Sequence, residues 1–209
     1  MKVAIISFHK NIKRYPDEWI NKYRKSILDQ THREYDIFEL NYGGEENRIF
    51  DNSNFYSLPM NNHAEAHNYL VNMCFESGYD AVMNSNVDDY YPPETLSILL
   101  MHYDPYFCLI SGNYQSFSEN NNNIHVTKFH YMDVEREFNR GHNIISHPCC
   151  LYTRSFPNYN ESLKSEEIPK DDFGMWKRML SKGAKFRILP NILLYYRISE
   201  LKTNTSINK

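Results

Sequence analysis

At residues 80–96 the chain reads DAVMNSNVDDYYPPETL, and this stretch indicates the fold. Asp80–Asn84 is predicted to be a strand. Pro92 and Pro93 then precede a helical pattern that has Glu94 in its first turn and leucines along one face, at Leu96, Leu99 and Leu100. A strand followed directly by a helix is the repeating unit of an α/β fold.

The same alternation continues towards the N-terminus. Val3–Phe8 is a continuous apolar run rich in β-branched residues, as expected for a strand buried on both faces of a parallel sheet. Further strands and helices are expected at Tyr35–Leu40, near Phe55, at Phe107–Ser111, over Trp19–Leu28 and from Asn61 or Asn62 to Gly78. The order βαβαβαβ predicts a mostly parallel sheet with a ligand crevice at the carboxyl ends of its strands.

The second half of the chain is less regular. Residues 114–126 contain the run Asn120–Asn123 and are expected to form a loop. A helix is predicted at Asp171–Lys182, and strands are predicted at 144–153, Phe186–Leu189 and Ile192–Ile198. Because no linker is visible, a single domain is expected over 1–199, followed by a polar tail at 200–209.

Composition excludes several classes of protein. The net charge is −3 and no basic stripe occurs, so a nucleic-acid partner is not expected. No run reaches the roughly 20 apolar residues of a transmembrane helix, and the N-terminal run is too short for a signal peptide. A cytoplasmic location is therefore expected, in a bacterium or in the cytosol of a virus-infected host.

The cysteines and histidines do not favour a zinc site. Cys74, Cys108, Cys149 and Cys150 form no C-x-x-C pair, so buried free thiols are expected. His63 and His67 have the i, i+4 spacing of zinc ligands, but the protease pattern H-E-x-x-H is absent.

Asn86–Asp89 gathers two carboxylates and an amide immediately after a central strand. Hard cations such as Mg²⁺ and Mn²⁺ prefer oxygen ligands and often combine one or two protein carboxylates with phosphate oxygens. The turn is therefore a candidate metal site beside a diphosphate. The alternative is a turn whose polar side chains cap backbone amides.

Eight segments in the same order resemble the GT-A glycosyltransferases of the large inverting family 2, over roughly residues 2–198. They are Val3–Phe8, Lys25–Thr31 (KSILDQT), Tyr35–Gly44, Ala66–Asn68, Asn86–Leu96, Tyr159–Leu163 (YNESL), Asp171–Arg178 (DDFGMWKR) and Leu193–Arg197 (LLYYR). Each segment alone is a weak signal, whereas their common order is specific. The resemblance implies a GT-A (Rossmann-like) α/β fold, with a mixed, mostly parallel sheet flanked by helices in a single domain.

The resemblance also implies a division of labour. Residues 1–112 would bind the nucleotide sugar, and residues 113–199 would bind the acceptor and carry out catalysis. Asp88 would ligate Mn²⁺ or Mg²⁺, and Asp172 would be the general base. Nucleotide-sugar binding is implied for Ser7, Phe8, Asn41, His67, Asn86 and Asp171. For Asp171 and Asp172 the alternative role is to cap the helix that they begin.

The chain departs from the family pattern at four positions. Asn41 replaces an Asp, which leaves the base preference open, and His67 replaces an Arg, which removes a permanent cation. Asn86 replaces the first Asp of the metal motif, and Ser199 stands where many relatives have a His. A weaker hold on the metal is therefore expected.

The implied activity is a metal-dependent, inverting, hexosyltransferase-type transfer from a nucleotide-diphosphate sugar, expected to be UDP-linked, to the hydroxyl of a carbohydrate or glycoconjugate. One alternative is a non-catalytic nucleotide-sugar-binding module, which the substitutions favour and the retained Asp88 and Asp172 disfavour. A nucleotidyltransferase is disfavoured because Ser7–Asn11 lacks the glycines of a phosphate-binding loop.

Overall fold

The computed structural model describes residues 1–118, 125–127, 134–156 and 171–198. Within these ranges eight strands form one sheet. The strands are β1 (Val3–His9), β2 (Asp36–Asn41), β3 (Asn54–Ser57), β4 (Ala81–Ser85), β5 (Leu109–Phe117), β6 (His125–Thr127), β7 (Leu151–Thr153) and β8 (Phe186–Arg197). The helices are α1 (Asp17–Leu28), α2 (His63–Glu76), α3 (Thr95–Met101), α4 (Val134–Asn139) and α5 (Asp171–Ser181), with short 3₁₀ turns at Ile12–Arg14 and His147–Cys149.

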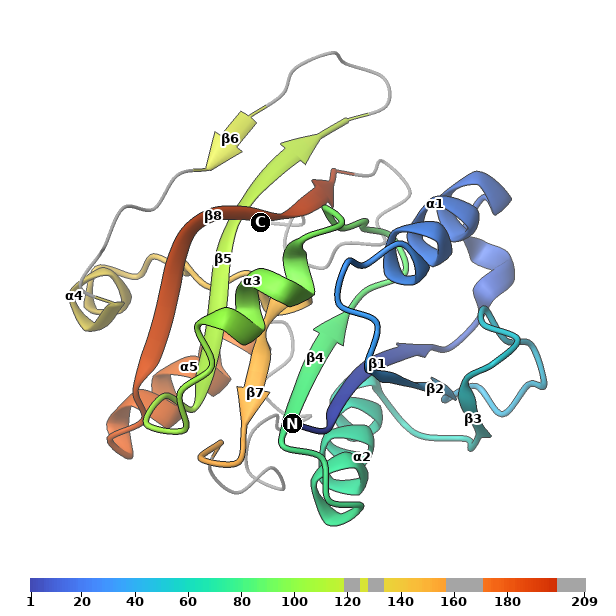
Figure 1. Cartoon of the computed structure of the whole chain (residues 1–209), viewed down its shortest axis with the longest axis horizontal. Helices are drawn as coiled ribbons and strands as arrows, with labels where there is room; N and C mark the ends of the chain where they lie inside the picture. Colours follow the sequence, from blue (N-terminus) through green and yellow to red (C-terminus); the bar gives the residue numbers. More distant parts are fainter. Residues whose placement is uncertain (119–124, 128–133, 157–170, 199–209) are drawn as a thin grey trace.

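The sheet is mixed and mostly parallel, as the sequence predicts. Strand β1 pairs in parallel with β2 and β4, β2 with β3, and β5 with β8. Strand β7 is antiparallel to both of its neighbours, and Figure 1 shows it pointing down between β4 and β5, which point up. Strand β6 pairs antiparallel with β5.

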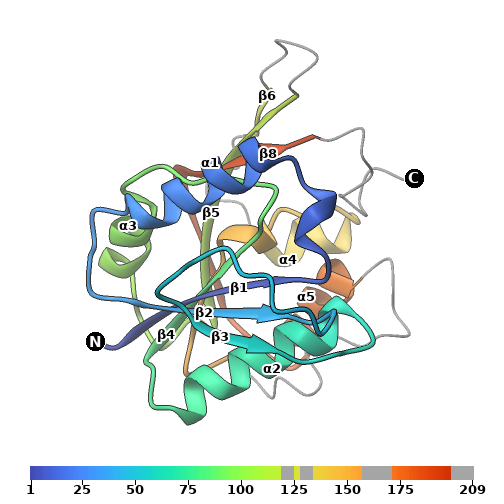
Figure 2. The same cartoon turned by 90° about the vertical axis from the view of Figure 1, so that its right-hand side faces the viewer.

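Helices cover both faces of the sheet. Figure 2 shows α1 and α3 above it and α2 below it. Because side chains alternate along a strand, β1 contributes to both cores. Val3 and Ile5 pack in the core that holds Tyr23 of α1, whereas Ala4 and Ile6 pack in the core that holds Leu70 of α2. The continuous apolar run therefore marks a strand buried on both faces, as predicted.

The helices begin and end at the signals in the sequence. In α1, the buried residues Trp19, Tyr23 and Ile27 recur every four positions and form its core-facing side. The Asn62 side chain caps α2 by accepting a hydrogen bond from the Glu65 N–H, and Gly78 follows the helix with a φ of 86°.

Gln30 joins the end of α1 to the start of α3. Its side-chain nitrogen donates to the Pro92 carbonyl, and its side-chain oxygen accepts from the Leu96 N–H, each at 2.8 Å. Gln30 is fully buried, so these bonds satisfy polar groups that would otherwise be costly in the core. The glutamine of the KSILDQT segment therefore holds the acidic turn's downstream helix in place.

The strand predicted at 144–153 is mostly wrong. Only Leu151–Thr153 is a strand, and His147–Cys149 forms a 3₁₀ turn. Pro148 explains the difference, because proline fixes φ and has no N–H to donate to a sheet.

The two strands predicted at the C-terminus are one strand, β8, which continues through Pro190. Its pairing with β5 shifts register around Gly112 and Asn113, and the Asn113 side chain donates to the Pro190 carbonyl at 3.0 Å. This bulge lets the proline lie within a strand. Strand β5 is longer than predicted and extends to Phe117.

Other predictions have mixed outcomes. All four cysteines are buried and free, as expected. Among the described helices, none has both the length and the apolar character needed to cross a bilayer. The run Asn120–Asn123, the segment Tyr159–Leu163, Ser199 and the tail at 200–209 lie outside the described residues.

Candidate active site

The carboxyl ends of β1, β2 and β4 meet at one edge of the sheet. His9 lies opposite Asn41 of β2, and Ser7 lies opposite Ser85 of β4. The chain leaves β4 directly into the acidic turn Asn86–Asp89. The predicted crevice edge therefore gathers Ser7, Asn41 and the acidic turn, whereas His67 lies in α2 and Asp171 begins α5.

A buried tyrosine holds the backbone of the acidic turn in place. The hydroxyl of Tyr91 accepts from the Asn86 N–H at 3.0 Å and donates to the Pro148 carbonyl at 2.9 Å. Tyr91 is only 3% exposed. Burial raises its pKa well above the usual value, and the nearby Asp89 carboxylate raises it further, so the hydroxyl stays a donor at neutral pH.

The end of β8 makes hydrogen bonds to the same turn. The Arg197 N–H donates to the Asp89 carboxylate at 2.9 Å, and the Arg197 Nε donates to the backbone carbonyl of Asp88 at the same distance. The guanidinium lies 4.2 Å from the centre of the Trp19 ring. Sequence reasoning gave Arg197 no role beyond its motif. Its partner, Asp89, precedes it by 108 positions.

The two carboxylates of the turn are both buried. Asp88 is 9% exposed and Asp89 is 2% exposed. Burial raises the pKa of Asp89 well above its usual value, and the charge of Asp88 raises it further. The Asp89 Oδ2 atom is buried and has no hydrogen-bond partner among the described residues. An added cation would offset both the burial of these two negative charges and the repulsion between them.

These residues fit a hard divalent cation held partly by the substrate. Asp88 and the unpaired Asp89 oxygen would supply carboxylate ligands. The described residues contain no group of three His, Cys, Asp or Glu side chains suited to a metal. The remaining ligands would come from phosphate oxygens, as Mg²⁺ sites often require. The same result gives no support to zinc binding by His63 and His67 within the described structure.

The Asn41 side chain holds the loop after β2. Its Oδ1 accepts from the Gly43 N–H at 2.9 Å, and its Nδ2 donates to the Asn47 carbonyl at 3.4 Å. Asn41 is fully buried. Its predicted role with the nucleoside remains a prediction, because both ends of the amide are already used by the protein.

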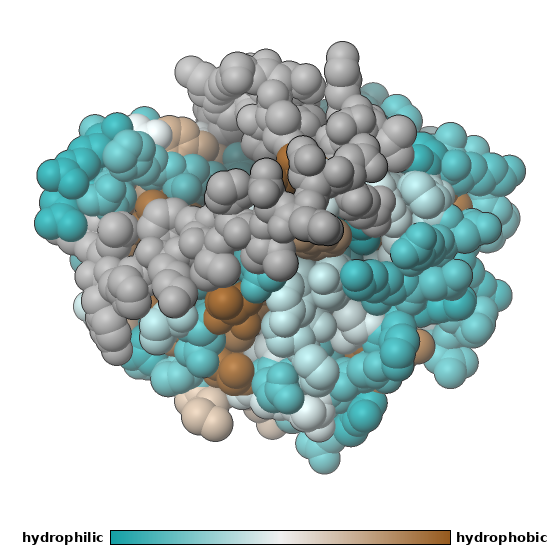
Figure 3. Space-filling model, turned by 90° about the horizontal axis from the view of Figure 1, so that it is seen from above, coloured by the Kyte–Doolittle hydropathy of each residue, from teal (hydrophilic) through white to brown (hydrophobic). Residues whose placement is uncertain are grey.

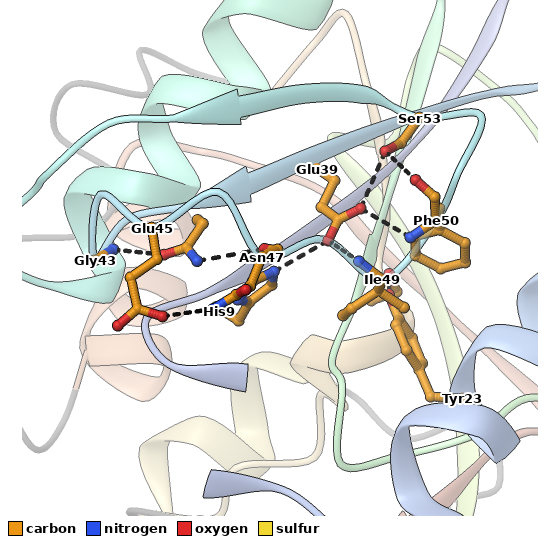
Figure 4. Close-up of polar contacts among 11 residues, drawn as sticks. His9, Tyr23, Glu39, Gly43, Glu45, Asn47, Ile49, Phe50 and Ser53 are labelled. Carbon is orange, nitrogen blue, oxygen red and sulfur yellow. Dashed lines mark hydrogen bonds and ion pairs between the residues drawn. The ribbon is translucent and has the colours of Figure 1, made fainter. Parts of the chain in front are cut away.

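Glu39 anchors the same loop from within β2. Its carboxylate lies 3.0 Å from the His9 Nε2 and accepts from the Phe50 N–H at 3.1 Å and the Ser53 hydroxyl at 3.0 Å. It also accepts from the Ile49 N–H, and Figure 4 shows these groups converging on it. Sequence reasoning missed this network. The available signal was a carboxylate inside an otherwise buried strand.

His67 is not a surface cation. It is fully buried, its Nε2 lies 3.1 Å from the Tyr152 hydroxyl, and its ring lies 5.1 Å from that of His147. Burial lowers its pKa well below the usual value, and His147 lowers it further. A neutral imidazole therefore stands where the family resemblance implies an arginine.

Ser7 and Phe8 differ in exposure. Ser7 is buried, whereas Phe8 is partly exposed and its ring contacts Tyr42 and His67. Of these two residues, Phe8 is therefore the better placed to contact a ligand. Both assignments to the nucleoside pocket remain predictions.

Asp172 lies in the first turn of α5 and is partly exposed. Its Oδ2 accepts from the Asn143 side-chain amide at 3.2 Å, and its Oδ1 accepts from the Phe173 N–H at 2.8 Å. One turn later, Trp176 is buried and contacts the ring of His147. Asp171 begins the helix, and its side chain lies outside what the structure describes.

The turn His147–Cys149 connects the two acidic regions. Its Pro148 carbonyl holds Tyr91 below the acidic turn, and its His147 ring packs on Trp176 of α5. The Asn84 amide of β4 donates to the His147 carbonyl at 3.0 Å. The carboxyl end of β4 and the start of α5 therefore pack on one shared turn.

The described part of the surface seen from above is mainly polar. Figure 3 shows the molecule from above, where hydrophilic residues predominate and hydrophobic ones form only small patches. One surface hollow is lined by Lys2, Arg33 and Asp36, at the amino ends of β1 and β2. That hollow lies at the opposite edge from the acidic turn, so it does not belong to the candidate site.

The sheet order and flanking helices define a GT-A-like glycosyltransferase fold. No protein-family model and no curated protein matches the sequence. Among solved structures, the chain is similar to S. aureus TarS 1–349 in complex with UDP-GlcNAc, with a TM-score of 0.67, 14% identity, and coverage of 100% of this chain and 62% of that one.

The mannosyltransferase PcManGT from Pyrobaculum calidifontis, solved with GDP-Man and Mn²⁺, is also similar. Its TM-score is 0.65 at 12% identity, over 95% of this chain and 57% of that one. The chain thus spans about three fifths of the length of these structures. The fold expected from the sequence is confirmed.

Proposed function

We propose that the protein is an inverting glycosyltransferase that moves a sugar from a nucleoside-diphosphate sugar, with uridine as the base, to the hydroxyl of a carbohydrate acceptor. The observation that supports this most is the pairing of two acidic regions on one GT-A-like sheet. Asp88 follows β4, Asp172 lies in the first turn of α5, and both regions pack on the turn His147–Cys149. The TarS and PcManGT complexes contain UDP-GlcNAc and GDP-Man, respectively.

In the proposed reaction, the acceptor hydroxyl attacks the anomeric carbon from the face opposite the diphosphate. Asp172 removes the hydroxyl proton as the new C–O bond forms. The bond between the anomeric carbon and the diphosphate oxygen breaks, and the diphosphate leaves with the electron pair. Configuration at the anomeric carbon is therefore inverted.

Asp88 is the proposed principal ligand of Mn²⁺ or Mg²⁺, with Asn86 and Asp89 beside it. When bound, the cation would neutralise negative charge on the departing diphosphate. Arg197 and Tyr91 hold the turn from two sides through backbone atoms and the Asp89 carboxylate. The protein thus presents the metal ligands in a fixed arrangement.

A thermal-shift screen of nucleotide sugars, with and without Mn²⁺, tests this function. A ligand at 100 times its Kd stabilises the folded state by about 2.7 kcal/mol, which corresponds to roughly 5–10 °C in Tm for a chain of this size. We expect such a shift with a UDP-linked sugar and Mn²⁺, and its loss in Asp88→Asn. A shift with a GDP-linked sugar alone would correct the base, and no shift with any donor would refute the proposal.

Two observations favour a second candidate, a nucleotide-sugar-binding module without turnover. His67 is neutral where a cation is implied, and the Asn41 amide is occupied within its loop. This candidate predicts the same thermal shift without release of nucleoside diphosphate. Measuring that release from the stabilising donor separates the two functions.

A further inference from the structure

The Asn143 side chain bridges its own loop and the candidate base. Its Nδ2 lies 3.2 Å from the Asp172 Oδ2, and its Oδ1 accepts from the Ile145 N–H at 3.2 Å. An amide has distinct donor and acceptor ends. Because a backbone N–H can only donate, it requires the oxygen on its side, which leaves the nitrogen facing the carboxylate.

The loop that carries Asn143 is anchored on both sides. Upstream, Glu137 is largely buried and makes two contacts with His142. The His142 N–H donates to the Glu137 carbonyl at 2.9 Å, and the His142 Nδ1 lies 3.0 Å from the Glu137 carboxylate. Downstream, Ile144 and Ile145 are 2% and 4% exposed in the core. Asn143 is exposed between these anchors, so its amide is aimed by the backbone rather than by its own packing.

We propose that Asn143 is a positioning residue for Asp172: its amide donates to one carboxylate oxygen and fixes the orientation of the base. This inference rests on the proposed function. The second oxygen of Asp172 accepts from the Phe173 N–H at 2.8 Å. A carboxylate oxygen has more than one lone pair, so a hydrogen bond from the amide does not by itself prevent the carboxylate from accepting the proton of an acceptor hydroxyl.

The two ends of the amide can be tested separately. The oxygen has a structural role, since it accepts from the Ile145 N–H within the loop. The nitrogen has the positioning role. Asn143→Asp keeps an oxygen for the Ile145 N–H in the same shape, removes the donor to Asp172 and places a second carboxylate beside it, whose charge also acts on Asp172. Asn143→Ala removes both ends of the amide without adding charge. A positioning residue should therefore lose turnover in both variants, whereas a purely structural asparagine should lose stability in Asn143→Ala and keep its kcat.

The experiment compares wild type, Asn143→Asp, Asn143→Ala and Asp172→Asn. Release of nucleoside diphosphate is followed with water as acceptor, and donor Kd is measured by titration. For Asn143→Asp and Asn143→Ala we expect kcat to fall about 10- to 100-fold, while donor Kd stays within about twofold of wild type and the Tm of Asn143→Asp stays within a few degrees of it. A kcat within twofold of wild type in Asn143→Ala would overturn the inference.

A measurement without turnover separates this inference from the proposed function. In ¹⁵N NMR spectra, the side-chain NH₂ signal of Asn143, assigned by its loss in Asn143→Asp, should shift as Asp172 titrates. The shift should disappear in Asp172→Asn. If wild type releases no nucleoside diphosphate but the signal titrates, the reaction is refuted and the contact stands. A signal that does not respond to Asp172 refutes the positioning role.

Discussion

The acidic turn at Asn86–Asp89 and the start of α5 at Asp172 hold their carboxylates in different ways. In the turn, Asp89 is almost fully buried and accepts from the Arg197 backbone, and the Tyr91 hydroxyl holds the Asn86 N–H. Asp172 is partly exposed and is met by the Asn143 side chain, which projects from an exposed loop position.

This difference indicates how the protein would accommodate the two proposed substrates. A turn held by buried groups from several elements loses little freedom when it binds, so we expect a preformed donor side. A partly exposed carboxylate that is contacted by an exposed side chain can adjust its position more readily to an acceptor. Variants on the two sides should therefore fail in different measurements.

The largest expected effect is that of Asp172→Asn on turnover. The amide cannot remove the acceptor proton, so kcat should fall about 10²- to 10⁴-fold. Donor Kd should stay near wild type because the acidic turn is unchanged, and Asp29→Asn, an exposed aspartate after α1, should keep wild-type kcat. Steady-state release of nucleoside diphosphate and donor titration measure both quantities. An unaltered kcat would remove Asp172 from the reaction.

On the donor side, Glu39→Ala should act on stability. The change leaves His9 and the Ile49 and Phe50 N–H groups without a buried acceptor. Breaking a buried polar pair on one side costs about 3 kcal/mol or more, which is roughly 6 °C or more in Tm. Glu45→Ala is the matched control, since Glu45 is an exposed carboxylate in the same loop. Equal melting temperatures for the two variants would contradict the anchoring role.

Two glycines compare the loops of the two sides. A Cβ on Gly43 would overlap the carbonyl oxygen of Lys10, whereas a Cβ on Gly141 would meet no atom within 4 Å. Gly43→Ala should therefore cost about 2–3 kcal/mol through overpacking. Gly141→Ala should cost about 1 kcal/mol, because its φ of 85° strains an alanine. Chemical denaturation measures the free energy of unfolding of both variants. A larger loss of stability in Gly141→Ala than in Gly43→Ala would show that the loop before Asn143 is the more tightly packed of the two.

The sequence predicted the donor side better than the acceptor side, for a physical reason. Strand β1, helix α1 and the cap at Asn62 depend on neighbouring residues, so periodicity and cap chemistry locate them. The contacts that finish the site join residues far apart in the chain, such as Asn143 with Asp172 and Asp89 with Arg197. No local pattern carries such pairs, and the resemblance assigned roles to Asp88 and Asp172 without the residues that hold them.

The last prediction concerns the pH dependence of stability and His67, whose ring contacts that of Phe8. Burial keeps its pKa in the folded state well below the usual value near 6.5. Between these two pKa values the unfolded chain binds more protons, so stability falls as pH drops below about 6.5. The loss attributable to His67 should approach about 1.4 kcal/mol per pH unit. His67→Gln should flatten this dependence, as measured by urea unfolding between pH 7 and pH 5. An identical slope in wild type and His67→Gln would mean that the buried imidazole takes up its proton without unfolding, and that the donor side is less rigid than its contacts indicate.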